Sequence, residues 1–305
     1  MSGKLLSMSE AIRRFVSNGD VVMAEGFTHL IPFAAGHEII RQGKKDLTLC
    51  RLTPDLIYDQ LIAAGVARKI VFSWAGNPGV GSLHALRRAV EKDVPCAVEI
   101  EEYSHFGMVS RLVAGASGLP FMPLRNYAGT DLPRVNESIR KVTCPFTGEG
   151  LYAVPALKPD VTIVHAQRAD EQGNTQIWGL MGVQKEASFA AKRVIVVVEE
   201  VVSEETIRSD PNRTLIPGLI VSAVVHEPWG AHPSYVQGFY DRDNTFYVEW
   251  DAVARGRESM ERYLDEWVHG VSGRAEYMAK LGEGVKKRLC PEPLLSPPVN
   301  YGMYR

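Results

Sequence analysis

The chain has 305 residues, a net charge of −2, 45% hydrophobic and 23% charged residues, which suits one large α/β domain or two smaller ones. A chain this close to neutral, without a basic cluster interleaved with aromatic residues, is not typical of a nucleic-acid-binding protein. The aliphatic run 194–198 is far shorter than a membrane span, and the N-terminus lacks the apolar core of a signal peptide. We therefore expect a soluble, cytoplasmic protein.

Apolar and amphipathic stretches alternate through the first 118 residues. Ser7 and Glu10 have the spacing of a capping box and open the first expected helix. The expected strands are 20–26, 46–52, 69–74 and 96–103, and the expected helices are 7–16, 32–43, 55–65, 82–93 and 105–118. Continuous apolar strands that alternate with helices of 10 to 14 residues predict an open, mostly parallel sheet flanked by helices.

The pattern changes between about residues 125 and 160, where prolines and glycines are frequent and strand-like pieces are short. We expect an ordered excursion there, such as a small antiparallel element inserted in the sheet domain. Strands resume at 160–166, 193–200 and 218–228, and amphipathic helices are expected near 257–269 and 273–288. The chain is thus predicted to form a single domain over residues 1–290, followed by a Pro-rich tail over 291–305.

Two glycine-containing turns follow expected strands. Gly26 ends the first strand, and a glycine permits backbone geometries and close approaches that a side chain would block. The loop after the third strand carries Gly76, Gly79 and Gly81 before a helix, which can present free N–H groups to an anion. Ligands of open parallel sheets bind beyond the carboxyl ends of the strands. Neither turn matches a nucleotide-binding fingerprint, so a generic anion or carbonyl-oxygen site and plain chain turns both stay open.

Titratable residues also gather at strand ends. By alternation Glu99 and Glu101 face one side of the fourth strand and Glu102 faces the other, and each can be a site carboxylate or a solvated charge. For Glu199 and Glu200, which follow the aliphatic run 194–198, we favour a structural role. His165 has no partners at metal-ligand spacing and no nucleophile elbow accompanies it, so a hydrogen-bonded core residue is the favoured interpretation. The four cysteines form no Cys-x-x-Cys pair, so neither a zinc site nor a disulfide framework is expected.

Several stretches, in the same order, resemble the A subunit of class I coenzyme A transferases: "NGDVVMAEGFT", "GLPFMP", "IVHAQRADEQGN", "VVEEVV" and "VVHEPWGAHPS". "GFYDRDNTF" followed by "YLDEWV" narrows the resemblance toward the glutaconate CoA-transferases, and the similarity runs from about residue 5 to 285. The resemblance implies an open α/β fold shared by both subunit types. It also implies a heteromeric enzyme, α2β2 or larger, built from A and B chains.

The resemblance implies a covalent mechanism. In this family the acyl-CoA is attacked by a glutamate of the B subunit; an acyl-glutamyl anhydride and then a glutamyl-CoA thioester form, and CoA passes to a second carboxylate. The A subunit is implied to supply binding surface and oxyanion-stabilising groups. On this chain Gly26, Phe27 and Thr28 would bind the acyl group, and Gly76 and Asn77 would line the pocket. The resemblance implies no resident cofactor or metal, because coenzyme A enters as part of a thioester substrate. The second substrate is a carboxylic acid, which in the glutaconate type is a dicarboxylic acid.

The sequence departs from the family pattern at two positions. The family loop reads Gly-Gly-Phe, and Glu25 replaces the first glycine; Pro78 stands where the glutaconate pattern has a serine. Relatives on this scaffold include hydrolases of ring-derived acyl-CoA thioesters and decarboxylases. In some of them the A subunit contributes a glutamate, and Glu102 corresponds to its position, which makes Glu102 the catalytic or substrate-orienting candidate.

Three functions remain open at this point. The favoured one is that of a CoA-transferase A subunit whose substrate is a dicarboxylic or related acid. A ring-opening or other acyl-CoA hydrolase, or a decarboxylase, on the same scaffold is the alternative. A non-catalytic acyl-CoA-binding protein is the third.

Overall fold

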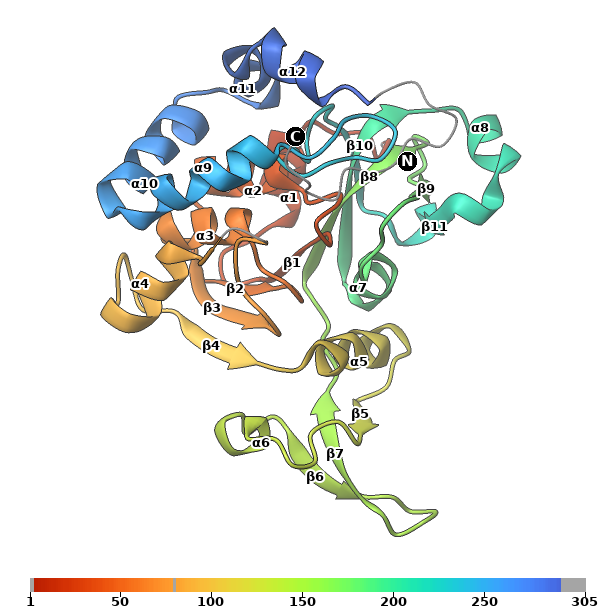
Figure 1. Cartoon of the computed structure of the whole chain (residues 1–305). Helices are drawn as coiled ribbons and strands as arrows, with labels where there is room; N and C mark the ends of the chain where they lie inside the picture. Colours follow the sequence, from red (N-terminus) through yellow and green to blue (C-terminus); the bar gives the residue numbers. More distant parts are fainter. Residues whose placement is uncertain (1–2, 79–80, 292–305) are drawn as a thin grey trace.

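The computed structural model describes residues 3–78 and 81–291, so the predicted tail beyond residue 291 lies outside the described residues. The described residues form one nine-stranded sheet, a small antiparallel sheet and the helices around them (Figure 1). The strands of the large sheet are β1 (Val21–Glu25), β2 (Leu47–Cys50), β3 (Ala67–Phe72), β4 (Glu99–Glu102), β8 (Val161–Ala169), β9 (Thr175–Gln176), β10 (Arg193–Val201), β11 (Thr214–Ile216) and β12 (Ala223–His226).

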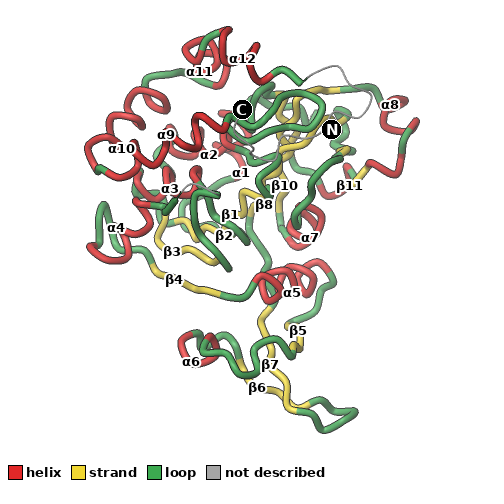
Figure 2. Tube along the Cα trace, in the orientation of Figure 1, coloured by secondary structure: helices red, strands yellow, loops and turns green. Residues whose placement is uncertain are grey.

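The helices follow the predicted alternation in the first half of the chain and gather near the C-terminus in the second (Figure 2). They are α1 (Met8–Phe15), α2 (Phe33–Arg41), α3 (Leu56–Ala63), α4 (His84–Lys92), α5 (His105–Ala116), α6 (Leu132–Val135), α7 (Gln184–Ala190), α8 (Glu204–Ser209), α9 (Asn244–Arg255), α10 (Arg257–Leu264), α11 (Arg274–Leu281) and α12 (Glu283–Leu289). Within the described part of the chain, no helix combines the length and apolar character that crossing a bilayer requires.

The large sheet is parallel along its main path, in the order β4-β3-β2-β1-β8-β10-β12. Strands β9 and β11 add a short antiparallel extension beside the carboxyl end of β8. The chain builds outward from β1 on one side and then from β8 on the other, so the strand order reverses between these two neighbours. This confirms the predicted open, mostly parallel sheet flanked by helices.

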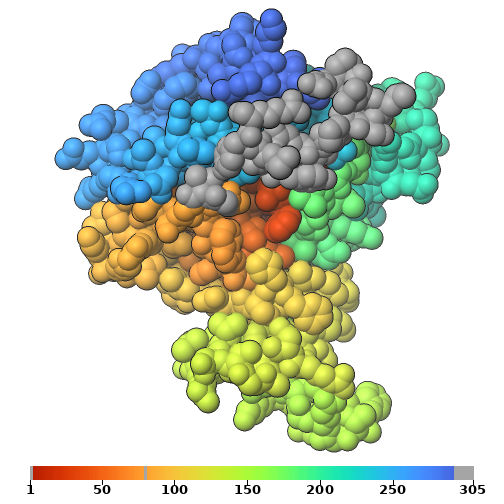
Figure 3. Space-filling view, viewed as in Figure 1, coloured from red at the N-terminus to blue at the C-terminus, as the bar shows by residue number. Residues whose placement is uncertain are grey.

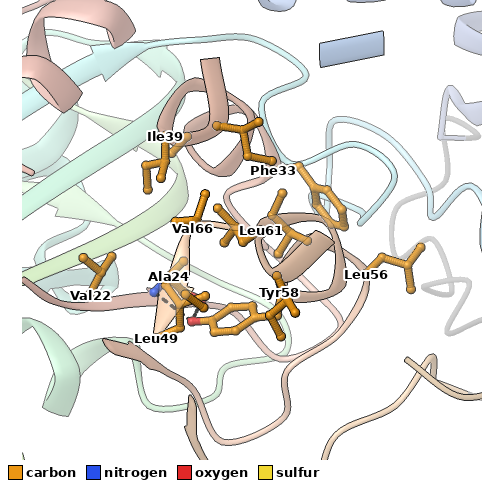
Figure 4. Close-up of a cluster of buried hydrophobic side chains, with 14 of the residues drawn as sticks. Val22, Ala24, Phe33, Ile39, Leu49, Leu56, Tyr58, Leu61 and Val66 are labelled. Atoms are coloured by element: carbon orange, nitrogen blue, oxygen red, sulfur yellow. Dashed lines mark hydrogen bonds between the residues drawn. The ribbon is translucent and has the colours of Figure 1, made fainter. Parts of the chain in front are cut away.

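The main core lies between the sheet and helices α1 to α4 and α9 to α10. Figure 4 shows part of it, with β1 and β2 contributing Val22, Ala24 and Leu49, and helices α2 and α3 contributing Phe33 and Leu61 among others. Each such fully buried aliphatic or aromatic side chain stabilises the fold by about 1.5–3 kcal/mol. The Tyr58 hydroxyl in this core donates to the Cys50 carbonyl at 2.6 Å and accepts from the Ala24 N–H at 3.2 Å, so it connects α3 to the edges of β1 and β2.

A three-stranded antiparallel unit, which we call the arm, projects from the other face of the sheet below α5 (Figures 1 and 3). It contains β5 (Phe121–Leu124), α6, β6 (Arg140–Thr143) and β7 (Gly150–Pro155), with β7 in the middle. Its inner side shares a hydrophobic cluster with α5 and α7. The predicted excursion is therefore ordered and antiparallel.

The C-terminal elements differ most from the sequence expectation. The helix expected at 273–288 is broken at Gly282, whose φ of 90° ends α11 before α12 begins. The helix expected at 257–269 is α10 followed by one π-helical turn over Asp265–His269. Helix α9 was not predicted, although the Asp243 side chain caps it by accepting from the Phe246 N–H at 3.2 Å. Its apolar face packs on α4 and α10, and this packing cannot be read from the sequence of the helix alone.

Candidate active site

The candidate site lies where β1 and β8 diverge. These strands pair in parallel up to Glu25 and Val164, and the segments that follow them leave toward opposite halves of the sheet. In open α/β sheets, this reversal of strand order leaves a crevice at the carboxyl ends of the strands, which is the usual place for a ligand. The segment after β1 is the turn 26–30, and the loops 177–184 and 230–240 pack against it.

The turn 26–30 has an unusual backbone. Thr28 and Leu30 both have left-handed φ angles, 56° and 58°, which are rare for side-chain-bearing residues and especially for a β-branched threonine. The loop 230–240 holds the turn in place: the Ser234 hydroxyl donates to the Thr28 carbonyl at 2.9 Å, and the Leu30 N–H donates to the Tyr235 carbonyl at 3.1 Å. Backbone strain held in this way by surrounding contacts is concentrated at functional sites.

His29 connects the turn to both neighbouring loops, and sequence reasoning missed it. Its Nδ1 lies 2.7 Å from the Leu180 carbonyl oxygen, and its Nε2 accepts from the Gln237 N–H at 3.0 Å. These contacts fix a neutral imidazole with the proton on Nδ1. Burial lowers the pKa of His29 to about 4, although the Leu180 carbonyl opposes the shift. The imidazole also stacks on Tyr235, with ring centroids 4.4 Å apart. A lone histidine after Thr28 gave no sequence signal for this role.

Gly26 is required by the turn itself. A Cβ at this position would lie 2.6 Å from the Leu30 carbonyl oxygen and 2.8 Å from that of His29, which a side-chain-bearing residue cannot tolerate. The expectation from sequence was that the missing side chain gives a ligand access to the backbone; the structure shows that its immediate effect is to let the chain fold back on itself. Phe27 and Thr28 follow as half-buried residues, whereas His29 and Leu30 are buried.

A buried charge network lies beneath the turn. Arg51, just after β2, forms an ion pair with Asp55 at 2.9 Å, and its guanidinium also donates to the Gly26 carbonyl. Burial raises the pKa of Asp55, while Arg51 lowers it. Burial raises the pKa of Glu25 to about 7, although the Arg51 guanidinium and nearby backbone amides oppose this. Four ionisable groups, with Arg242 as the fourth, are thus removed from water under the site.

The loop after β3 reaches this network from the other side. The Asn77 side-chain amide donates to the Tyr247 carbonyl in α9 at 2.8 Å, so this residue anchors the loop. The Gly76 N–H donates to the Pro54 carbonyl at 3.2 Å. Arg242 donates to the Pro78 carbonyl at 3.2 Å and its guanidinium lies over the Tyr247 ring at 3.9 Å. The structure therefore connects the predicted Gly26 and Gly76 turns through Arg51, Asp55 and Arg242.

Glu102 lies apart from these residues. It ends β4, the edge strand, three strand spacings or roughly 14 Å from β1 in the hydrogen-bonding direction. Its side chain is exposed, and its backbone carbonyl accepts from the Asn136 side chain at 2.7 Å. The groove that it lines is formed by β4, Lys69 and residues 135–138, and none of residues 26–28, 76 or 77 lines this groove.

The neighbouring glutamates follow the predicted alternation. Lys69 binds both Glu99 and Glu101, each at 2.6 Å, so these two face the same side of β4. Glu101 also pairs with Arg111 at 3.0 Å and accepts from the Tyr103 hydroxyl at 2.6 Å. Partial burial tends to raise its pKa, but Lys69, Tyr103 and Arg111 together hold it below the usual value. Glu101 is thus a structural carboxylate, whereas Glu102 is exposed.

His165 and Glu199 form a buried pair, with Nε2 and Oε1 2.7 Å apart. Glu199 also accepts from the Tyr240 hydroxyl and from the Trp229 N–H, each at 2.7 Å. These contacts fix the loop 229–240 to the sheet. His165 is a hydrogen-bonded core residue, as predicted, and Glu199 is buried and paired with it. Across the described residues, no group of three or more His, Cys, Asp or Glu side chains is placed to hold a metal ion.

Comparison with known proteins identifies the family of the chain. A family model described as coenzyme A transferase matches residues 5–227. The A subunit of 3-oxoadipate CoA-transferase from Pseudomonas knackmussii is 58% identical over 281 residues, which cover 92% of this chain and 99% of that protein. The crystal structure of glutaconate CoA-transferase from Acidaminococcus fermentans matches with a TM-score of 0.90 at 34% identity, covering 95% of this chain and 96% of that one.

A third relative has a different activity. The crystal structure of the decarboxylase AibA/AibB matches with a TM-score of 0.70 at 30% identity, covering 91% of this chain and 97% of that one. The extent of the family match, the full-length similarity to an A-type chain and the shared fold all agree. The chain therefore belongs to the coenzyme A transferase family, in its A-type branch.

Proposed function

We propose that this chain is the A subunit of a heteromeric CoA transferase that moves CoA between an acyl-CoA and a dicarboxylic acid of the 3-oxoadipate or glutaconate kind. The nucleophilic glutamate belongs to a B-type partner. Support for the substrate class comes from the 58% identity, over nearly the whole chain, to the A subunit of a 3-oxoadipate CoA-transferase, and from the similarity to glutaconate CoA-transferase.

The observation that carries the proposal is the rigid turn 26–30 at the point where β1 and β8 diverge. Held on both sides by Leu180 and by the loop 234–237, this turn cannot relax when charge develops on a bound acyl group. We infer that backbone N–H groups of this turn face the acyl group, where preorganised donors would stabilise an oxyanion because no reorganisation is needed in the transition state. Phe27 and Thr28 supply the half-buried surface against which the acyl chain packs.

The carboxyl that adjoins the turn does not serve as the nucleophile. Glu25 is only 1% exposed, so it cannot reach a thioester carbonyl, and the exposed Glu102 lies three strands away. A covalent mechanism therefore draws its attacking carboxylate from outside the turn, which agrees with a site completed by a B-type chain.

The test is reconstitution with a B-type partner. The purified chain alone is expected to show no CoA transfer from an acyl-CoA to 3-oxoadipate or glutaconate, and the mixture with the partner is expected to show it. Hydroxylamine or borohydride, added with the acyl-CoA, should trap a glutamyl thioester on the partner. Robust acyl-CoA turnover by the single chain, or an adduct on this chain, would contradict the proposal.

A hydrolase or decarboxylase is the second candidate, because the Glu102 side chain is exposed in its groove without an ion pair to any described residue, and a decarboxylase shares the fold. This candidate replaces the first if the assembled protein consumes the thioester or the carbon skeleton without an acceptor acid and without a covalent adduct.

A further inference from the structure

Glu25 is buried between two turns that come from different halves of the chain. It is the last residue of β1, and the turn 26–30 begins at the next residue. On the other side lies the segment 182–184, which leads into α7. A Cβ on Gly182 would lie 2.8 Å from Glu25 Oε1 and 3.0 Å from the Phe27 Cβ, so this segment packs directly on the carboxyl and on the start of the turn.

The surroundings of the carboxyl do not suit a full negative charge. Glu25 Oε2 is buried without a hydrogen-bond partner among the described residues, and an ionised carboxylate with an unpaired buried oxygen is costly. Arg51, Asp55 and Tyr58 are the titratable groups that interact with it in the described part of the chain, and Asp55 is itself a carboxyl. Arg51 is already paired with Asp55 and bound to the Gly26 carbonyl. The backbone amides of Val183 and Gly26 also bind the carboxyl and favour its charged form, but burial outweighs them.

We propose that Glu25 is a positioning residue of the acyl site, and that its buried carboxyl, in the neutral form, holds the turn 26–30 in place against the segment 182–184. This inference rests on the proposed function for its kinetic consequence. When the carboxyl ionises, a buried negative charge appears beneath Gly26 and Phe27, only partly offset by Arg51 and the backbone amides. That charge opposes the oxyanion that the turn stabilises. Transition-state stabilisation is therefore lost, and kcat falls more than KM rises.

The kinetic experiment compares Glu25→Gln, which keeps the shape and the neutral state, with Glu25→Ala, which empties the space. Both are assembled with the B-type partner, and kcat and KM are measured from about pH 5.5 to 9, a range that brackets the titration. Glu38→Gln is the matched control, because Glu38 is also a buried glutamate but pairs with Arg41 at 2.8 Å on α2, away from the site.

The parent and the control are expected to lose kcat as the pH rises through about 7, the value to which burial brings the Glu25 pKa. Glu25→Gln is expected to keep kcat over the same range. Glu25→Ala is expected to lower kcat about tenfold or more at every pH, on the scale of one lost supporting contact. If Glu25→Gln shows the same high-pH loss as the parent, or falls as far as Glu25→Ala while folded, the proposal is wrong.

A second measurement does not depend on catalysis. The glutamate carboxyl carbons of the isolated chain are labelled with ¹³C, Glu25 is assigned from the resonance missing in Glu25→Gln, and its titration is followed by NMR. A midpoint near 7 supports the proposal even if the chain proves to have another activity, whereas a midpoint at the ordinary value of 4.5 overturns it. Thermal unfolding of each variant shows whether it is folded.

Discussion

Arg51 and Asp55 form an ion pair in which both side chains are only 1% exposed and Nη1 and Oδ1 are 2.9 Å apart. The same guanidinium donates to the carbonyl of Gly26, so the pair is part of the support for the turn that follows β1. A buried pair of this kind is not strongly stabilising compared with apolar residues, but breaking it leaves one charge without compensation.

Asp55→Ala is therefore expected to destabilise the chain strongly, by about 3–5 kcal/mol, because Arg51 stays buried without its counter-ion. The free energy of unfolding is measured by denaturant titration. The matched control is Asp131→Ala: Asp131 pairs with Arg134 at 2.7 Å, but both side chains are more than four-fifths exposed. This control is expected to change stability by less than about 1 kcal/mol. Equal effects of the two substitutions would contradict the interpretation.

Gly26→Val is expected to lower stability and activity together. Sequence reasoning alone predicts a loss mainly of activity, but the Cβ would lie 2.6 Å from the Leu30 carbonyl oxygen, so the turn must open before any ligand binds. Gly150→Ala is the control, since a Cβ there meets no atom within 4 Å. Thermal unfolding and CoA-transfer assays of the assembled enzyme test this. A Gly26→Val variant with the parent's melting temperature would show that the turn accommodates the side chain.

For the second candidate function, Glu102→Ala is expected to lower kcat of the assembled protein by roughly 100-fold, the scale of a lost proton-handling or orienting group, with little change in stability because the side chain is exposed. For the proposed transferase, little change in kcat is expected, because Glu102 lies three strands from the turn 26–30. Glu101→Ala is expected to show the reverse, a lower melting temperature with a much smaller effect on kcat, because it removes the partner of Lys69 and Arg111. If Glu102→Ala has the parent's kinetics, this glutamate is a solvated charge.

The pH dependence of stability carries a separate signature. Burial lowers the pKa values of His29 and His232 to about 4, so the stability that their neutral forms contribute is present above pH 6.5 and is lost as the pH falls. The pKa of Glu25 is raised to about 7, so its contribution is present below pH 4.5 and is lost as the pH rises through about 7. Between about pH 4.5 and 6.5, acidification therefore increases the stability contributed by Glu25 and decreases that contributed by the two histidines.

Glu25→Gln removes the contribution of the Glu25 carboxyl and leaves that of the histidines. The free energy of unfolding of the variant is expected to fall more steeply than that of the parent on acidification from about pH 6.5 to 4.5, by up to about 1.4 kcal/mol per pH unit. Denaturant titrations at several pH values measure the two slopes. Parallel curves for parent and variant would show that Glu25 titrates alike in the folded and unfolded chain.

The sheet was predictable because its signal is local. A continuous aliphatic run such as Val194–Val198 indicates a buried strand, and the alternation of strands with helices indicates a parallel sheet. The strand ends indicated where the candidate site lies. The hydrogen bonds within it could not be predicted, because they join distant parts of the chain: the Asn77 side chain donates to the carbonyl of Tyr247, 170 positions away. The elevated pKa of Glu25 likewise depends on burial by segments that its own sequence neighbourhood does not reveal.

The arm enters and leaves the body of the protein at a single point, where the Ala156 N–H donates to the Pro120 carbonyl at 3.0 Å. In the topology of the large sheet, the whole arm is therefore an insertion in the connection between α5 and β8. The far end of the arm, where Phe146 is 94% exposed between β6 and β7, can therefore carry a fluorophore, an affinity tag or an inserted domain without changing the order of the strands. The assembled enzyme can thus be immobilised or observed through the arm while the turn 26–30 stays unmodified.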